Sequence, residues 1–305
     1  MVSDAGKKIR LGVPSGFLRF GLEAAFREGI LKREEIEIAE IKGEKDILRM
    51  LLDGSLDMGR IASIEAVKAN ARKEPVYVVA GFDNQMVYVV LGSRSIHAPE
   101  DLRNRKAGVN GFGDYTDQYM RAALNHLGLT PDKDVQVVEA GKSAERRRQL
   151  AADQIQATIV SQVQALRLKK EGFPWLVQMA DVFPQYQSKV IVANEKALSG
   201  NREGVKKILI ALIKGCRYLD EGGNDQEIGK IIQSLNLKDP ELALSQISIR
   251  RSRNPLDDGS VTMKGFEVVM AEARKKGAVS PDYNLDQLFQ FAPLRDAQKE
   301  LGLAG

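Results

Sequence analysis

The sequence predicts an α/β protein of two lobes, each a mostly parallel sheet flanked by helices, with a helical C-terminal region packed on lobe 1. Three observations predict this fold class. Strand-like and helix-like segments alternate up to about residue 190, which is typical of parallel sheets covered by helices. The same order of segments occurs once before residue 90 and once after it. The length of 305 residues fits two domains of about 150 residues.

The first occurrence of this order begins at residue 9. An apolar run over residues 9–13 predicts a strand, and a Pro-Ser-Gly loop follows it. A helix is expected over residues 17–28, because Gly29 is the kind of residue that stops a helix. The strands and helices that follow in this half are expected at residues 37–41, 43–52, 56–61, 64–71 and 76–80.

The second occurrence begins with a strand over residues 106–109. The glycine-rich loop 110–113 ends this strand, and a helix is expected over residues 115–127, with Gly128 as its stop. The remaining strands and helices of this half are expected at residues 135–139, 143–152 and 155–160. The order of strand, loop, helix and stop is therefore repeated, although the sequence identity between the halves is weak.

The chain is expected to cross between the lobes twice, near residues 88–92 and 187–191. Lobe 1 then comprises residues 1–90 and 189–305, and lobe 2 comprises residues 91–188. Two such crossings form a two-strand hinge. The region after residue 195 is predicted to be helical, with helices at residues 202–219, 225–235, 240–247, 263–275 and 285–291.

Composition and charge argue against several classes of protein. The 45 basic and 41 acidic residues nearly balance, and the basic run 146–148 is expected to be a solvated helix face, so no nucleic-acid partner is expected. No apolar run approaches the ~20 residues that cross a bilayer. One Cys and two His residues exclude an intrachain disulfide and leave no metal site or cofactor to expect. Residues 1–8 lack the apolar stretch of a secretory signal, which predicts an exported protein with its signal removed, or a cytoplasmic one if the chain is complete.

Several segments, taken in order, resemble a known family. They are PSGFL at residues 14–18, FREG at 26–29, LDGSLDMG at 52–59, PVYVVAG at 75–81, SIHAPEDL at 95–102 and KAGV at 106–109. This series resembles the nitrate/taurine/sulfonate-type solute-binding proteins of ABC importers, which have the two-lobed periplasmic binding fold. The resemblance covers about residues 8–200. It implies an interlobe cleft that closes on a small solute, an ABC transporter permease as partner and a periplasmic location; we also expect a monomer.

Ligand contacts are expected from the loops at the carboxyl ends of the strands, where open α/β sheets bind ligands. If two lobes face each other, these loops line one cleft. The predicted ligand-binding residues are Ser15, Gly16, Phe17, Arg60, Ala62, Ser63, Asp83, Asn84, Asn110, Phe112, Gly113, Asp114, Tyr115, Ser161, Gln162, Gln185 and Tyr186.

Two of these features suggest an anionic ligand. Arg60 ends an otherwise apolar strand, where it would bind a carboxylate or sulfonate, or else form a structural salt bridge. The loop 110–114 precedes a helix whose free N–H groups favour an anion. The alternative for this loop is a glycine turn in which Asp114 or Thr116 caps the helix. A dinucleotide site is disfavoured, because Thr116 occupies the position of the third glycine.

Aromatic residues in the predicted cleft loops suggest a flat or aromatic ligand, although ordinary packing would also explain them. They are Phe17, Phe112, Tyr115, Phe183 and Tyr186. Asp83 and Asn84 at the first crossing are expected either to contact the ligand or to satisfy the turn. Acidic residues in these loops leave the charge of the ligand open.

The predicted function is capture of a small organic anion, an aromatic or other carboxylate or sulfonate, without catalysis. Cys216 lies among apolar helical residues as a small core residue, and neither His97 nor His126 has a carboxylate at a spacing that suggests a catalytic dyad. The alternative is an enzyme of the same fold that acts on a small aromatic acid or pyrimidine, of the decarboxylase, desulfinase or pyrimidine-synthesis type.

Overall fold

The computed structural model describes residues 7–14, 16–41, 43–253 and 257–303. The chain forms two compact units, of which unit 1 is Met1–Asn84 with Gln185–Gly305 and unit 2 is Gln85–Pro184. The crossings therefore lie after Asn84 and after Pro184, whereas the sequence placed the boundaries at residues 90/91 and 188/189. The difference arises because β5 (Tyr88–Gly92) pairs entirely within the sheet of unit 2.

Unit 1 is built on a five-stranded sheet in the order β2-β1-β3-β10-β4. Its strands are β1 (Ile9–Val13), β2 (Ile36–Glu40), β3 (Met58–Ala62), β4 (Val76–Asp83) and β10 (Lys189–Asn194). β1 pairs in parallel with β2 and β3, whereas β10 runs antiparallel between β3 and β4. Of these five strands, β10 alone runs in the opposite direction. The carboxyl ends of β1, β3 and β4 therefore lie at one edge of the sheet.

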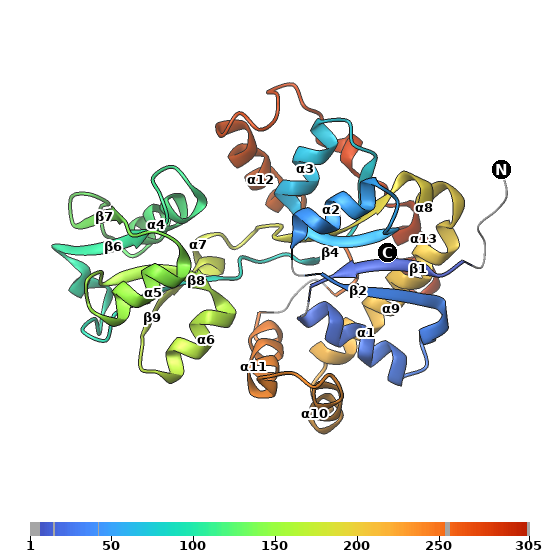
Figure 1. The fold of residues 1–305 in the computed structure, drawn as a ribbon, viewed down its shortest axis with the longest axis horizontal. Helices are drawn as coiled ribbons and strands as arrows, with labels where there is room; N and C mark the ends of the chain where they lie inside the picture. Colours follow the sequence, from blue (N-terminus) through green and yellow to red (C-terminus); the bar gives the residue numbers. More distant parts are fainter. Residues whose placement is uncertain (1–6, 15, 42, 254–256, 304–305) are drawn as a thin grey trace. The chain divides into compact units, whose positions relative to one another are not determined.

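Helices cover both faces of this sheet (Figure 1). Those of the first segment are α1 (Phe17–Arg27), α2 (Glu44–Leu52) and α3 (Ser63–Ala71). Those of the second segment are α8 (Glu195–Gly200), α9 (Arg202–Asp220), α10 (Asp225–Ser234), α11 (Pro240–Arg251), α12 (Met263–Lys275) and α13 (Ala292–Glu300). α1 and α9 pack together on one face, where Leu11, Leu22 and Leu212 join one buried core, while α2 covers the other face. The helical C-terminal region is therefore part of unit 1.

Unit 2 repeats this plan with the strand order β7-β6-β8-β5-β9. Its other strands are β6 (Arg105–Val109), β7 (Val135–Glu139), β8 (Ala157–Ser161) and β9 (Trp175–Gln178). Its helices are α4 (Tyr115–His126), α5 (Ser143–Ala151), α6 (Gln162–Lys170) and α7 (Met179–Val182). β6 is parallel to β7 and β8, and β5 runs antiparallel between β8 and β9. The fold class predicted from the sequence is confirmed.

Short 3₁₀ turns complete the secondary structure at Arg33–Glu35, Pro99–Leu102 and Leu285–Leu288. The helix expected at residues 285–291 is wrong, because a 3₁₀ turn occupies its start and α13 begins after it. Pro293 stands in the first turn of α13, where proline is tolerated because the N–H groups there have no intrahelical acceptor. In the described part of the chain, no helix combines the length and apolar composition that a membrane span requires.

Candidate functional site

The carboxyl edge of the unit 1 sheet carries the first set of predicted residues. Gly16 and Phe17 follow β1 at the start of α1, and Ala62 ends β3 immediately before Ser63. Asp83 ends β4. Ser15 lies outside the described residues. Because the parallel strands β1, β3 and β4 end on the same side, we call this region the unit 1 edge.

Arg60 and Asp83 form an ion pair at the unit 1 edge. Arg60 donates from Nε and Nη2 to the same Asp83 oxygen, Oδ2, at 2.8 and 2.7 Å. The two side chains are 19% and 16% exposed, so solvent screens the pair only partly. Two predicted site residues are thus brought together, but each neutralises the other. Of the two interpretations of Arg60, the structure contains the salt bridge.

Arg250 of α11 is a part of this edge that sequence reasoning missed. Its guanidinium carbon lies 4.2 Å from the centre of the Phe17 ring, and its Nη1 donates to the Phe82 carbonyl at 2.6 Å. Its Nε donates to Asp220 Oδ2 at 3.0 Å. Burial raises the pKa of Asp220, although the Arg250 charge acts in the opposite direction. No local signal in the sequence links α11 to β4, since the residues lie far apart along the chain.

Other predicted residues serve to hold the returning chain in place. The Ala62 N–H donates to Glu44 Oε2 at 2.9 Å, and Glu44 also pairs with Lys189 at the start of β10. The buried Ser63 hydroxyl donates to the Gln187 carbonyl. The Ala62 N–H and the Ser63 hydroxyl, which were expected to bind a ligand, are therefore hydrogen-bonded within the protein.

The residues at the crossings differ in exposure. Asn84 is half-buried and Gln185 is exposed. Tyr186 is only 7% exposed, and its hydroxyl donates to Glu272 Oε2 of α12 at 3.3 Å. The Tyr186 ring is therefore packed inside unit 1, and a contact between this residue and a ligand stays a prediction.

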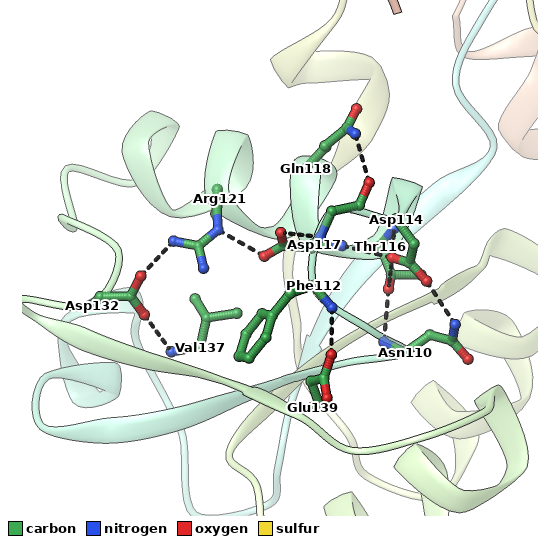
Figure 2. A network of polar contacts seen from close by, with 11 residues as sticks. Asn110, Phe112, Asp114, Thr116, Asp117, Gln118, Arg121, Asp132, Val137 and Glu139 are labelled. Carbon is green, nitrogen blue, oxygen red and sulfur yellow. Dashed lines mark hydrogen bonds and ion pairs between the residues drawn. The ribbon is translucent and has the colours of Figure 1, made fainter. Parts of the chain in front are cut away.

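In unit 2, most N–H groups of the loop 110–114 already have acceptors within the protein (Figure 2). The Phe112 N–H donates to Glu139 Oε1 at 2.7 Å, and the Gly113 N–H donates to Asp117 Oδ2 at 2.8 Å. The Asn110 N–H donates to the Thr116 hydroxyl at 2.8 Å. Side chains of the protein therefore accept three of the N–H groups that the sequence had suggested for an anion.

Asp114 caps α4, as the alternative interpretation proposed. Its Oδ1 accepts the N–H groups of Thr116 and Asp117 at 2.7 and 3.1 Å, and its Oδ2 accepts from Asn110 Nδ2 at 2.7 Å. Burial opposes ionisation, but hydrogen bonds from the Thr116 and Asn110 side chains and from the backbone lower the pKa of Asp114 below its ordinary value. Ionised Asp114 thus satisfies the positive end of the α4 dipole.

The last predicted residues of unit 2 are Ser161, which ends β8, and Gln162, which begins α6. They lie at the carboxyl edge of the unit 2 sheet, which also carries the loop 110–114. Ser161 caps α6, where its hydroxyl oxygen accepts the Gln164 N–H at 3.4 Å. The Gln162 N–H donates to the Val87 carbonyl at 2.8 Å. The Ser143 hydroxyl donates to Gln164 Oε1 at 3.1 Å, so the starts of α5 and α6 lie side by side.

An aromatic cluster lies beside this edge in unit 2. The rings of Tyr88, Tyr115 and Tyr119 have centroids 5.7 to 6.0 Å apart, and Phe183 lies 5.9 Å from Tyr119. Tyr115 is 43% exposed and Phe112 is 58% exposed. Sequence reasoning found Phe112, Tyr115 and Phe183 and missed the other two tyrosines. These exposed rings can cover the apolar part of a small molecule.

Arg146 corrects the expectation that the run 146–148 is a solvated helix face. It is only 3% exposed, and it donates to Thr158 Oγ1 at 3.0 Å, to the Gly141 carbonyl at 2.7 Å and to the Ile159 carbonyl at 3.2 Å. Burial lowers the pKa of Arg146. The helical period could have revealed this, because Arg146 stands four residues before the buried Leu150 on the same face.

Two kinds of reactive group were sought among the described residues: an activated cysteine thiol and a cluster of metal ligands. Cys216 is fully buried in α9, and burial raises its pKa to about 12. Its thiol is therefore not poised to form a thiolate at neutral pH. Within residues that the structure describes, no group of three or more His, Cys, Asp or Glu side chains could hold a metal ion.

Solved structures share this fold over nearly the whole chain. The periplasmic aliphatic sulphonate binding protein SsuA of Escherichia coli is 16% identical with a TM-score of 0.68, over 93% of this chain and 92% of SsuA. The periplasmic nitrate-binding protein NrtA of Synechocystis PCC 6803 is 14% identical with a TM-score of 0.70, over 100% and 91% of the two chains. The chain therefore has the two-lobed periplasmic binding fold.

The family follows from the sequence comparison. The profile of the family described as NMT1/THI5 like matches residues 24–221, and the chain belongs to this family. A curated relative, the 4-amino-5-hydroxymethyl-2-methylpyrimidine phosphate synthase THI11 of Saccharomyces cerevisiae, is 25% identical over 208 residues. The match covers 63% of this chain and 60% of THI11, so the chain spans less than two thirds of that relative.

Proposed function

We propose that the protein is a solute-binding protein that captures a small organic anion and delivers it to an ABC-type importer. The observation that carries this proposal is the fold, which it shares with SsuA and NrtA, two proteins described as binding sulphonates and nitrate. In that arrangement the protein acts outside the cytoplasm as a monomer, and its partner is the importer's permease.

The residues at the two sheet edges fit this role. Unit 1 brings Phe17 and the Arg60–Asp83 pair to its edge, and unit 2 brings the exposed Phe112 and Tyr115 rings to its own. Each set combines polar groups or exposed rings of the kind that hold a small solute.

The second candidate is an enzyme, and the relationship to the THI11 synthase is the observation that favours it. An enzyme of this fold would act on a small aromatic acid or a pyrimidine. The buried Cys216 with its raised pKa is a poor nucleophile for such a reaction. We therefore place binding first.

Native mass spectrometry of the purified protein and a thermal-shift screen test this proposal. The screen uses nitrate, taurine, ethanesulfonate and benzoate, with a neutral pyrimidine for comparison. A true ligand at about 100 times its Kd stabilises the folded state by about 2.7 kcal/mol. We expect one of the anions to raise Tm by several degrees and to be recovered chemically unchanged. Steady formation of a product from a bound molecule would place the protein among enzymes instead.

A further inference from the structure

Two arginine–aspartate pairs in unit 1 differ in how they use their polar atoms. In the Arg10–Asp57 pair, Arg10 Nε donates to Asp57 Oδ2 at 3.0 Å and Nη2 donates to Oδ1 at 2.6 Å, so both carboxylate oxygens are occupied. In the Arg60–Asp83 pair, Arg60 Nε donates to Asp83 Oδ2 at 2.8 Å, and Nη2 lies 2.7 Å from the same oxygen. The second pair therefore leaves one carboxylate oxygen and one guanidinium nitrogen unused.

The unused atoms are Asp83 Oδ1 and Arg60 Nη1. Among the described residues, Oδ1 accepts no hydrogen bond and Nη1 donates none. Neither atom is buried, because the buried side-chain atoms that lack a hydrogen bond in the described part of the chain are Arg19 Nη1 and Gln178 Oε1. The unit 1 edge thus presents one acceptor and one donor, on the two members of a single ion pair, that a solute can reach.

Hydrogen bonds of the backbone around Asp83 hold the acceptor in place. The Asp83 carbonyl accepts the Ser188 N–H at 2.8 Å and Gln187 Nε2 at 3.3 Å. On the preceding residue, the Phe82 carbonyl accepts from Arg250 Nη1 at 2.6 Å. Because the chain is fixed at both carbonyls, little conformational freedom is lost when a solute binds the Asp83 carboxylate.

The charges at the unit 1 edge are already balanced by ion pairs within the protein. Three cations of this edge have a carboxylate partner, in the pairs Arg60–Asp83, Arg250–Asp220 and Lys189–Glu44. A plain anion that approached Arg60 would meet the negative charge of Asp83 beside it, and the free oxygen of Asp83 would gain no donor. A solute that carries an N–H group next to its anionic group satisfies both unused atoms at once. The paired charges therefore favour a solute with both groups.

We propose that Asp83 Oδ1 and Arg60 Nη1 bind the solute together, so that the protein selects a small organic acid with an amino group close to its carboxylate or sulfonate group. Arg60 Nη1 donates to an anionic oxygen of the solute, and Asp83 Oδ1 accepts an N–H of the amino group. This inference rests on the proposed function, and it narrows the solute from organic acids in general to those that carry an N–H donor.

Pairs of probes that differ by one amino group test this selection in the full chain. The pairs are β-alanine with propionate, taurine with ethanesulfonate, and 4-aminobenzoate with benzoate, each titrated by calorimetry. We expect the amino member of at least one pair to bind the wild type about tenfold or more tightly than its plain partner, because the plain acid makes no hydrogen bond to the Asp83 carboxylate. A smaller preference in every pair overturns the inference.

Asp83→Asn removes the negative charge and keeps the size of the side chain. It should weaken binding of the amino probe by about tenfold or more and strengthen binding of the plain acid, because Arg60 then lacks its counter-ion. Asp57→Asn is the matched control, since Asp57 pairs with Arg10 at the opposite, amino edge of the same sheet. It should lower Tm, while the ratio of the two Kd values stays within about twofold of wild type. The preference of the wild type is measured without any variant, so it tests the inference even if Asp83→Asn folds poorly.

Each outcome bears on one proposal or both. If the wild type shows the preference and Asp83→Asn leaves it intact, another residue selects the amino group and this inference is overturned, while the proposed function stands. If the plain acids bind the wild type as tightly as the amino probes, the inference falls and the proposed function again stands. If no probe binds, the inference and the anionic part of the proposed function fall together. If a probe is converted to product, the proposed function falls, and the effect of Asp83→Asn on its Kd still supports or overturns the contact with Asp83.

Discussion

At the scale of single residues, the capping side chain decides what each helix start in unit 2 can still bind. Asp114 uses both oxygens on donors at the start of α4, so that helix dipole is already balanced. Ser161 caps α6 with a neutral hydroxyl. Lys142 leaves α5 uncapped. The three helix starts therefore differ in how far side chains of the protein satisfy their N–H groups.

Replacement of Asp114 tests the cap and its dependence on pH. Asp114→Ala should lower the free energy of unfolding by about 1 kcal/mol at pH 7, because the N–H groups of Thr116 and Asp117 lose their acceptor. Asp114→Asn keeps a capping oxygen and should cost less. Urea unfolding followed by circular dichroism measures both differences.

The lowered pKa of Asp114 fixes the sign of the pH effect. A carboxyl whose pKa is lower in the folded state contributes stability that is complete above its unfolded pKa, about 3.9, and is lost as the pH falls through the folded value. The difference in stability between wild type and Asp114→Asn should therefore shrink only below about pH 4. A difference that stayed constant down to pH 2 would contradict this account.

The sequence predicted the hydrogen-bond or ion-pair partners of a residue only where those partners lie a few positions away along the chain. Asp114 could be predicted as a cap because its partners stand two and three residues ahead. A salt bridge at Arg60 was one of two interpretations, but its partner Asp83 was not predicted, since the pair needs the ends of β3 and β4, which β10 separates in the sheet. Arg250 beside Phe17 depends on packing between α11 and α1 and could not be predicted. The predicted ligand contacts as a set remain predictions.

At the scale of elements, α1 and α9 approach each other very closely. A Cβ atom on Gly215 would stand 1.9 Å from the Gly21 carbonyl oxygen, so the two backbones approach at a point that only glycine permits. Cys216 packs next to this contact, where a Cβ on Gly21 would meet its sulfur at 3.1 Å. This close approach holds the second segment of unit 1 against the first.

Gly215→Ala should destabilise unit 1 by about 3 kcal/mol, because the added methyl group must push α1 and α9 apart. Gly229→Ala in α10 is the matched control, since nothing lies within 4 Å of the Cβ position there. It should stabilise the protein by about 0.5–1 kcal/mol through the better helix propensity of alanine. Equal Tm values for the two variants would mean that the helix contact is looser than described.

Strong periodicity and glycine stops predicted most elements, but not all. α1 and α4 lie within two residues of their expected ranges because Gly29 and Gly128 follow them closely. No element was expected at the positions of β9, α6, α7, α8 or α13. Two of these five are only four residues long, and such short runs carry too few periods to identify.

At the scale of the whole molecule, the antiparallel strand of each sheet is the feature that local pattern cannot supply. β5 follows the first segment of unit 1 but joins the sheet of unit 2, and β10 follows unit 2 but joins the sheet of unit 1. Alternating strands and helices predicted the two sheets correctly. The direction of these two strands depends on the crossings of the chain, which periodicity does not encode.

Unit 2 should fold by itself, because all five of its strands lie within residues 85–184. Its core includes Val89, Leu91, Leu150 and Phe173. A fragment of residues 85–184 is expected to show native-like circular dichroism and a cooperative urea transition. The fragment 1–84 is the control, and it should remain unfolded because β10 is missing between β3 and β4. A cooperative transition in fragment 1–84, or none in 85–184, would contradict this.

The position of β10 in the middle of the unit 1 sheet also constrains how the chain acquires its fold during synthesis. The ribosome releases β3 and β4 early, but the strand that must lie between them emerges only after all of unit 2 has been made. Until then, two apolar strand edges lack their hydrogen-bonding neighbour and are open to pairing with other chains. Unit 2 is therefore the first unit whose sheet can be completed during synthesis, although the synthesis of unit 1 begins earlier. A chaperone that shields nascent chains would be needed for the opening third of the sequence, and a stalled chain that ends before residue 189 would aggregate through the strands of unit 1.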